Sequence, residues 1–153
     1  MIKIRSVKHS EAELISELAI KSKAYWGYNK EFMDLCIDEL SYSETEIVDQ
    51  NFIYNLAERN GDVLGFYKLE NLNSETVLLE ALFIDPCSIR QGIGRTLLEH
   101  ALKTAKQCGA KALEAQSDLN AEPFYLAMGA TITGREESGS IKGRYLPMIN
   151  IVL

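Results

Sequence analysis

Residues 82–98 of this chain read LFIDPCSIRQGIGRTLL. In this segment an apolar, strand-like run leads through a polar loop into an amphipathic pattern that is typical of a helix. The loop holds two glycines, Gly92 and Gly94, and two cationic side chains, Arg90 and Arg95. The start of a helix exposes N–H groups without partners, and glycines allow an anion to approach them closely. The segment therefore predicts a site for a phosphate or a pyrophosphate group.

Two glycines alone are a weak signal. A dinucleotide fingerprint needs a third glycine where Leu97 stands, and a P-loop needs a Gly-Lys-Ser/Thr sequence that the chain lacks. The alternative interpretation is a tight turn whose small residues only allow a helix to pack closely.

The patterns on either side of this segment predict a mixed α/β fold with one domain over residues 1–153. Strands are expected at residues 2–7, 52–58, 63–69, 76–84, 112–115, 131–135 and 145–153. The turn Asn60-Gly61-Asp62 predicts a hairpin between the second and third of these strands, since both Asn and Gly tolerate positive φ. The order of elements indicates an antiparallel part built from hairpins and one βαβ unit.

Helices are predicted from capping signals and apolar spacing. The first should begin at a capping box that starts with Ser10 and bury Leu14, Leu18 and Tyr25 on one stripe. The others should cover residues 29–40, a short turn after a capping box at Ser43, residues 92–108, and a segment capped by Asn120 that runs to residue 128.

The composition excludes several classes of protein. The chain is 46% hydrophobic and 25% charged, which is average for a globular protein, and its longest apolar run, Phe124–Met128, is far below the ~18 residues of a membrane span. A net charge of −6 disfavours nucleic-acid binding. Three cysteines without C-x-x-C spacing and two separated histidines argue against a disulfide framework and a metal site. We therefore expect a cytoplasmic protein with no membrane, nucleic-acid or metal partner.

A second segment, SDLNAEPFYLAMGA at residues 117–130, completes a resemblance to a known family. Together with the glycine loop, it resembles the two motifs of GNAT N-acetyltransferases, in which an Asn precedes a helix that carries Phe-Tyr and ends in Gly. The resemblance implies a GNAT-like acyl-CoA N-acyltransferase fold, acetyl-CoA as the cofactor, and transfer of its acetyl group to a primary amine. Ile89 departs from the family pattern, since the loop there usually has Gln or Arg.

The resemblance also implies which residues hold the cofactor. The pyrophosphate should lie on the backbone amides of the glycine loop, and Asn120 should hydrogen-bond the pantetheine arm in addition to capping its helix. The full set of expected contacts is Leu82, Phe83, Ile84, Arg90, Gln91, Gly92, Ile93, Gly94, Arg95, Thr96 and Asn120.

Two side chains are candidates for the proton transfers of such a reaction. A primary amine with a pKa of about 10.4 is almost wholly protonated at pH 7, so a base must assist it, and the departing thiolate benefits from a proton donor. Glu80 interrupts an apolar strand, where desolvation should raise its pKa toward that of a useful base. Tyr125 matches the Tyr of the family's Phe-Tyr pair and is the candidate acid. The alternatives are a salt-bridged or edge-facing Glu80 and a core aromatic at Tyr125.

The acceptor site is less defined in the sequence. Tyr25, Trp26 and Tyr28 cluster where the first helix breaks and could line a pocket for a cationic amine, although helix packing explains them equally well. Arg144, in a Gly/Ser-rich loop, could hold a substrate carboxylate, or belong to a solvated loop. We therefore predict a small-molecule amine as acceptor.

Other functions remain open from the sequence alone. They are a protein or peptide N-acetyltransferase, a non-catalytic CoA-binding or regulatory module of the same fold, and an interaction domain whose loop binds nothing. A homodimer is also possible.

Overall fold

Seven strands form one mixed sheet in the computed structural model, which describes all residues 1–153. The strand order is β1-β2-β3-β4-β5-β7-β6, and every neighbouring pair is antiparallel except β4 with β5. The strands are β1 (Lys3–Ser6), β2 (Ile53–Arg59), β3 (Asp62–Glu70), β4 (Thr76–Ile84), β5 (Ala112–Gln116), β6 (Thr131–Glu137) and β7 (Tyr145–Val152). The predicted α/β class, with its antiparallel part and one βαβ unit, is confirmed.

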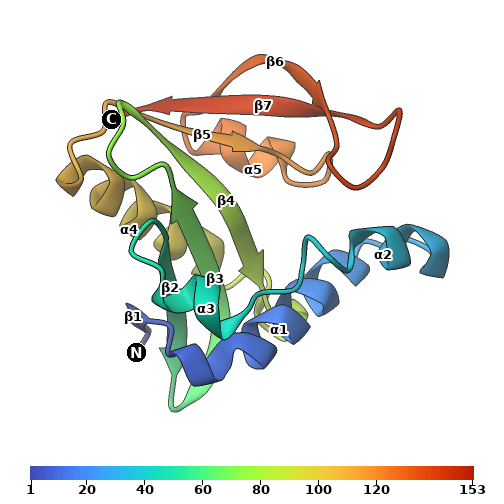
Figure 1. The fold of residues 1–153 in the computed structure, drawn as a ribbon, viewed down its shortest axis with the longest axis horizontal. Coiled ribbons are helices and arrows are strands. Elements are labelled where there is room, and N and C mark those ends of the chain that lie inside the picture. The colour runs from blue at the N-terminus through green and yellow to red at the C-terminus, as the bar shows by residue number, and fades with distance from the viewer.

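Helices cover the sheet on both faces (Figure 1). They are α1 (Ala12–Ala24), α2 (Lys30–Cys36), α3 (Glu44–Val48), α4 (Ile93–Gln107) and α5 (Glu122–Ala127), with short 3₁₀ turns at His9–Glu11 and Pro86–Ser88. One core lies between α4 and the sheet and is centred on Tyr67, Leu97 and Leu113. A second core, which includes Ile15, Cys36 and Phe66, joins α1 and α2 to the other face.

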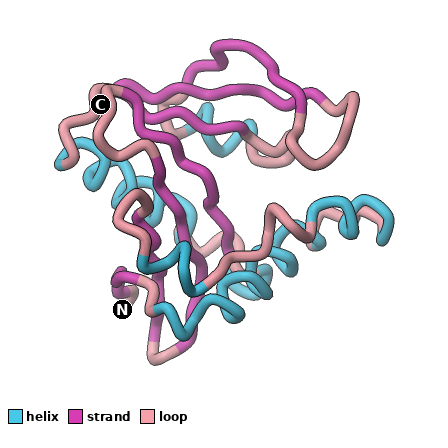
Figure 2. Tube along the Cα trace, in the orientation of Figure 1, coloured by secondary structure: helices cyan, strands magenta, loops and turns pink.

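The sheet opens between β4 and β5. These strands pair only at Thr76–Leu78 with Ala112–Glu114, and beyond this point β4 continues to Ile84 beside β3 alone. Figures 1 and 2 show the two strands diverging, with β5, β6 and β7 turned away from β1–β4. The free edge of β4 is therefore available to a ligand.

A bulge in β4 alters which of its residues face each core. Lys68 of β3 pairs with Ala81, but the next residue, Leu69, pairs with Leu79, which leaves Glu80 without a partner. Before the bulge, Leu79 packs in the α4 core, whereas after it Ala81 packs in the α1 core. Such bulges re-aim side chains at functional sites.

Several local predictions are confirmed. Asn60 and Gly61 have φ values of 54° and 85°, as a tight hairpin turn requires. Asn29 and Ser43 cap α2 and α3 by accepting hydrogen bonds from the amides of Phe32 and Glu46.

Three local predictions are wrong. Ser10 does not cap α1, because the Glu11 carboxylate instead accepts from the Lys8 amide and from Arg5. The buried stripe of α1 is Ala12, Ile15, Leu18 and Ala19, whereas Leu14 and Tyr25 are exposed. Asn120 does not cap α5, since Ala121 holds that position and makes no side-chain hydrogen bond there. At the start of α1 the contact of Glu11 with Arg5 outweighs the local pattern, and the Asn120 side chain donates to Tyr28 instead of capping α5.

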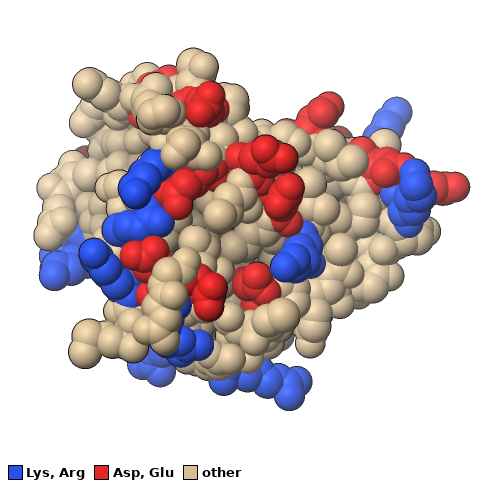
Figure 3. All heavy atoms as spheres, turned by 90° about the horizontal axis from the view of Figure 1, so that it is seen from below, with Lys and Arg blue, Asp and Glu red and all other residues tan.

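Charged side chains are unevenly distributed over the surface. On the face drawn in Figure 3, Asp and Glu gather across the middle, with Lys and Arg around them. No helix combines the length and the apolar character that crossing a membrane requires.

Candidate active site

Two cavities lie where β4 and β5 diverge. One, of about 440 Å³, is lined by the glycine loop, and we call it the loop-side cavity. The other, of about 190 Å³, lies toward α1 and the segment after α2, and we call it the acceptor-side cavity. Leu82, Phe83 and Tyr125 line both. A ligand in one cavity is therefore in reach of a ligand in the other.

The loop before α4 presents a row of free donors. The backbone N–H groups of residues 91–95 donate to no carbonyl or side-chain oxygen. Gly92 has a φ of 80°, a conformation that favours glycine, and Arg90 adopts a φ of 67°. Both arginines of the segment, Arg90 and Arg95, line the loop-side cavity. Free amides at a helix start with nearby cations fit a pyrophosphate.

Gly94 contributes space instead of unusual backbone geometry. A Cβ atom at this position would lie 3.5 Å from the Phe124 ring and 3.8 Å from the side chain of Ile84, both of which line the cavity. A larger side chain would therefore occupy part of the cavity itself.

The remaining predicted cofactor contacts divide into two groups. Leu82, Phe83, Ile84, Ile93 and Asn120 line the loop-side cavity. Thr96 and Gln91 do not line it. Their polar groups are engaged elsewhere: the amide and hydroxyl of Thr96 both donate to the Gly92 carbonyl, and the Gln91 side chain accepts from Arg59.

Glu80 lines the acceptor-side cavity. Its neighbours Leu79 and Ala81 are buried, but the bulge leaves the Glu80 side chain exposed to the cavity. The prediction that this strand is mostly buried is wrong: only Val77, Leu79 and Ala81 of β4 are buried, because β5 pairs with it only as far as Leu78. Partial desolvation, followed by the nearby Glu70 carboxylate, raises the pKa of Glu80 to about 7. A carboxylate with this pKa is suited to act as a general base near neutral pH.

Tyr125 stands at the junction of the two cavities. Its side chain is 6% exposed, and its hydroxyl has no protein hydrogen-bond partner although it is not fully enclosed. Burial raises the pKa of this hydroxyl well above its ordinary value. The group therefore carries its proton at neutral pH and faces the space where a ligand would lie.

A polar cluster borders both cavities, and the sequence singled out its members Tyr28, Asn120 and Arg144 but not Asp118 or Lys23. Asp118, two residues after the end of β5, accepts from Lys23 at 3.1 Å and from Tyr28 at 3.0 Å. Arg144 donates to the Tyr28 hydroxyl at 3.0 Å, and Asn120 donates to the same hydroxyl at 2.9 Å. Partial burial alone would raise the pKa of Asp118, but hydrogen bonds and the Lys23 charge lower it to about 2.

The three predicted acceptor aromatics do not form one pocket wall: Tyr25 and Trp26 contact each other edge to face at 5.3 Å between ring centroids, and Tyr28 packs elsewhere. Trp26, which is 49% exposed, lines the loop-side cavity, and Tyr25 lines neither cavity. Tyr28 stacks on Phe32 at 4.0 Å between ring centroids. Arg144 lines the acceptor-side cavity but is already paired with Asp118 at 3.4 Å, so its loop is not simply solvated.

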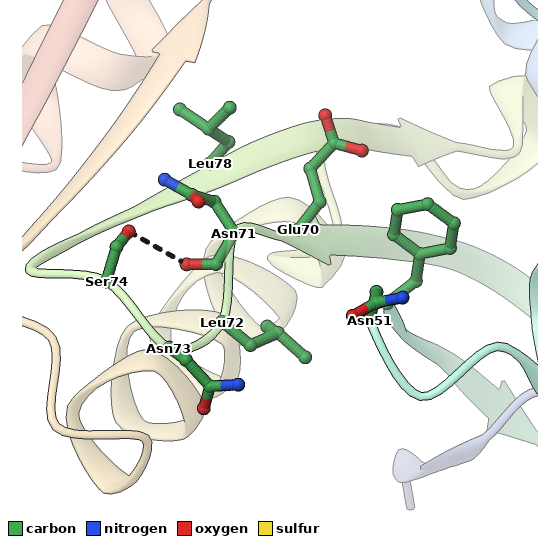
Figure 4. Close-up of a pocket in the computed structure, with 8 residues that line it drawn as sticks. Asn51, Glu70, Asn71, Leu72, Asn73, Ser74 and Leu78 are labelled. Carbon is green, nitrogen blue, oxygen red and sulfur yellow. Dashed lines mark hydrogen bonds between the residues drawn. The ribbon is translucent and has the colours of Figure 1, made fainter.

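A third depression, of about 620 Å³, lies apart from this junction. It surrounds the turn between β3 and β4, where the Ser74 hydroxyl donates to the Asn71 carbonyl (Figure 4). Its lining is polar and includes Asn51, Asn73 and Glu70. No candidate for acid–base or nucleophilic chemistry lies there except Glu70, which is next to Glu80.

Comparison with known proteins agrees with this geometry. A model of the acetyltransferase (GNAT) family matches residues 16–130. The chain is 28% identical over 152 residues to the peptidyl-lysine N-acetyltransferase YjaB of Salmonella typhimurium, covering 99% of this chain and 98% of that protein. It is 24% identical over 140 residues to the 5-NmdU N-acetyltransferase of Pseudomonas phage PaMx11, covering 91% and 94%.

A solved structure shares the fold over its full length. The PaiA N-acetyltransferase from Thermoplasma acidophilum, crystallised with coenzyme A, superposes with a TM-score of 0.82 at 22% identity, covering 100% of this chain and 99% of that one.

Proposed function

This chain belongs to the GNAT family of acetyltransferases and is an acetyl-CoA-dependent N-acetyltransferase, and we propose that Glu80 is its general base and Tyr125 its general acid. The observation that carries the proposal is the position of these side chains. Both line the acceptor-side cavity, and Tyr125 also lines the loop-side cavity. An amine and a thioester that meet at the junction therefore have both a proton acceptor and a proton donor in the walls around them.

The residues of the loop-side cavity fit a CoA thioester. The free amides of residues 92–95 and the two loop arginines suit the pyrophosphate, and the free edge of β4 at residues 82–84 suits the amide groups of the pantetheine arm. Bound acetyl-CoA supplies a carbonyl carbon open to attack and a thiolate leaving group.

The proposed reaction is a direct transfer. The acceptor amine forms the new C–N bond as the C–S bond breaks, Glu80 takes the proton that the amine loses, and Tyr125 gives its proton to the departing sulfur. Proton exchange with water then restores both side chains. The raised pKa of Tyr125 keeps its hydroxyl protonated near neutral pH, and with a pKa of about 7 a substantial fraction of Glu80 is ionised there and able to accept a proton.

We propose a small-molecule amine as acceptor. The acceptor-side cavity of about 190 Å³ has room for a slender alkyl amine, and Glu39 and Glu80 give it carboxylates that favour a cation, whereas Asp118 is already paired with Lys23 and Arg144. A lysine side chain has the same shape and charge, and similarity to YjaB over the full chain favours peptidyl lysine as the second candidate.

Release of free CoA thiol from acetyl-CoA tests both levels of the proposal. The panel of acceptors contains polyamines, amino acids, aminoglycosides, lysine-containing peptides and peptides with only a free N-terminus. We expect turnover with at least one small amine, and its loss in Glu80→Gln and Tyr125→Phe. Turnover only with lysine-containing peptides would replace the small-molecule assignment, and full activity of both variants would overturn the assigned roles.

A further inference from the structure

A buried lysine stands on β3 close to the candidate base. Lys68 is 7% exposed, and its ammonium lies 3.7 Å from the Glu46 carboxylate and 3.8 Å from the Glu70 carboxylate. It also lies 4.4 Å from the centre of the Phe52 ring, and the rings of Tyr42 and Tyr54 lie within 6 Å. A buried ammonium is costly unless it is paired, so this side chain is held in place by specific contacts.

The register of β3 and β4 places this lysine next to Glu80. Lys68 pairs with Ala81, and the unpaired residue of the bulge is Glu80, immediately before Ala81. Glu70 follows Lys68 by two residues in the same strand and therefore lies on the same face of the sheet. Figure 4 shows the Glu70 side chain projecting from β3 beside β4.

We propose that Lys68 and Glu70 are a pair of positioning residues whose opposite charges set the proton affinity of Glu80. The proposal rests on the role of Glu80 as the general base. Neither residue needs to touch the acetyl donor or the amine, since Lys68 is enclosed and Glu70 lines the neighbouring depression instead of the acceptor-side cavity.

The two charges act on Glu80 in opposite directions. The Glu70 carboxylate repels a second negative charge and so favours the protonated form of Glu80, whereas the Lys68 ammonium favours the ionised form. With both present, Glu80 binds its proton tightly enough to be a useful base but still loses it near neutral pH. Removing either charge should therefore shift the pKa of Glu80 in the direction favoured by the charge that remains.

Other groups also face Glu80 and must be held constant in any test. They come from α1, the segment after α2, the end of β5, α5 and the β6–β7 loop, and they are Lys23, Glu39, Tyr42, Asp118, Tyr125 and Arg144. None of them contacts Lys68 through a hydrogen bond or an ion pair. Variants at Lys68 and Glu70 therefore change the local charge while the cavity keeps its other ionisable groups.

The direct test is a pH titration of the Glu80 carboxyl carbon by ¹³C NMR, with Glu80→Gln used to assign the signal. We expect the midpoint to rise by about 1 pH unit in Lys68→Met and to fall by about 1 unit in Glu70→Gln. Glu46→Gln is the matched control, because it removes the other carboxylate partner of Lys68, and its midpoint should stay within a few tenths of a unit.

The outcomes separate this inference from the proposed function. Midpoints that do not move, or that move in the same direction in both variants, overturn the inference. If Lys68→Met does not fold, the downward shift in the partly exposed Glu70→Gln decides the question. Glu80→Gln with an unchanged pH–activity profile would instead overturn the role of Glu80 as base, whatever the NMR midpoints show.

Discussion

The hydroxyl of Tyr28 lies 3.0 Å from both carboxylate oxygens of Asp118, although 90 residues separate the two in the chain. This contact joins the loop after α1 to the loop after β5, at the border of the two cavities. Arg144 and Lys23 converge on the same pair and bring in the β6–β7 loop and α1. The cluster therefore holds three separate walls of the site together.

Asp118→Asn should weaken this cluster. The substitution leaves the charges of Lys23 and Arg144 without their partner, and we expect a loss of about 1–3 kcal/mol in the free energy of unfolding. The KM for the acceptor should rise several-fold, because the walls of the site are no longer held in fixed positions relative to one another. Thermal unfolding and steady-state kinetics measure both effects, with exposed Asp38→Asn as control. An unchanged KM would show that the cluster does not shape the acceptor site.

Tyr125→Phe should lower turnover by roughly 10²–10⁴-fold. The change keeps the buried ring and removes only the hydroxyl, which has no protein partner to lose. Stability and CoA affinity should therefore stay close to those of the wild type. Tyr145→Phe, at an exposed position, is the matched control. Normal turnover in Tyr125→Phe would mean that the thiolate leaves unassisted or that another group donates the proton.

Glu80→Gln should make the protein more stable at pH 8 while it abolishes most activity. The pKa of Glu80 is raised in the folded state from 4.5 to about 7, so the folded protein is favoured below pH 4.5 and loses this advantage as the pH rises to 7. Because the side chain is exposed to the cavity, we expect a gain of only about 1 kcal/mol at pH 8. Unfolding curves at pH 5 and pH 8, beside those of exposed Glu75→Gln, measure it. A variant that is less stable at pH 8 would contradict the raised pKa.

Gly94→Val should weaken the binding of acetyl-CoA by roughly tenfold or more, which is about 1.4 kcal/mol. A Cβ at this position already has side-chain atoms of Phe124 and Ile84 within 4 Å, so the added methyl groups of valine would fill part of the cavity. Gly134→Val is a suitable control, because nothing lies within 4 Å of a Cβ there. Isothermal titration on the folded variants compares the two. Equal affinities would place the cofactor elsewhere.

Acid stability should depend on Glu11. Two hydrogen bonds of 2.9 Å from Arg5 lower the pKa of Glu11 to about 2. A lowered pKa contributes stability above the unfolded value of 4.5, and this stability is lost as the pH falls from 4.5 toward 2. Glu11→Gln should therefore cost about 1–2 kcal/mol at pH 7 and have little effect at pH 2. Glu13→Gln, at an exposed position, should be neutral throughout.

Local elements and turns that depend on immediate neighbours could be predicted from the sequence. The loop before α4 is an example, because its glycines, its preceding strand and its following helix are contiguous. The Asn60-Gly61 turn is another, since the backbone conformation of these residues decides the hairpin.

Residues whose roles depend on partners far along the chain could not be predicted. The sequence shows Glu80 in an apolar strand, but only pairing with β3 reveals the bulge that exposes it. Asp118 lies in the segment before α5, yet its partners come from two distant segments, Lys23 and Tyr28 around the end of α1 and Arg144 in the β6–β7 loop. Ser10 has the sequence pattern of a helix cap, but the ion pair between its neighbour Glu11 and Arg5 replaces that cap.

Because β4 diverges from β5, the site for the acetyl donor and the site for the acceptor amine are built from different segments of the sequence. The loop-side cavity depends chiefly on one stretch, residues 82–95, whereas much of the acceptor-side wall comes from residues 39–42 and 138–146. Apart from Arg144, which belongs to the Asp118 cluster, substitutions in these outer stretches leave the residues around the acetyl donor unchanged. A directed-evolution library confined to these stretches would change which amine is accepted, while the residues that bind the acetyl donor stay the same.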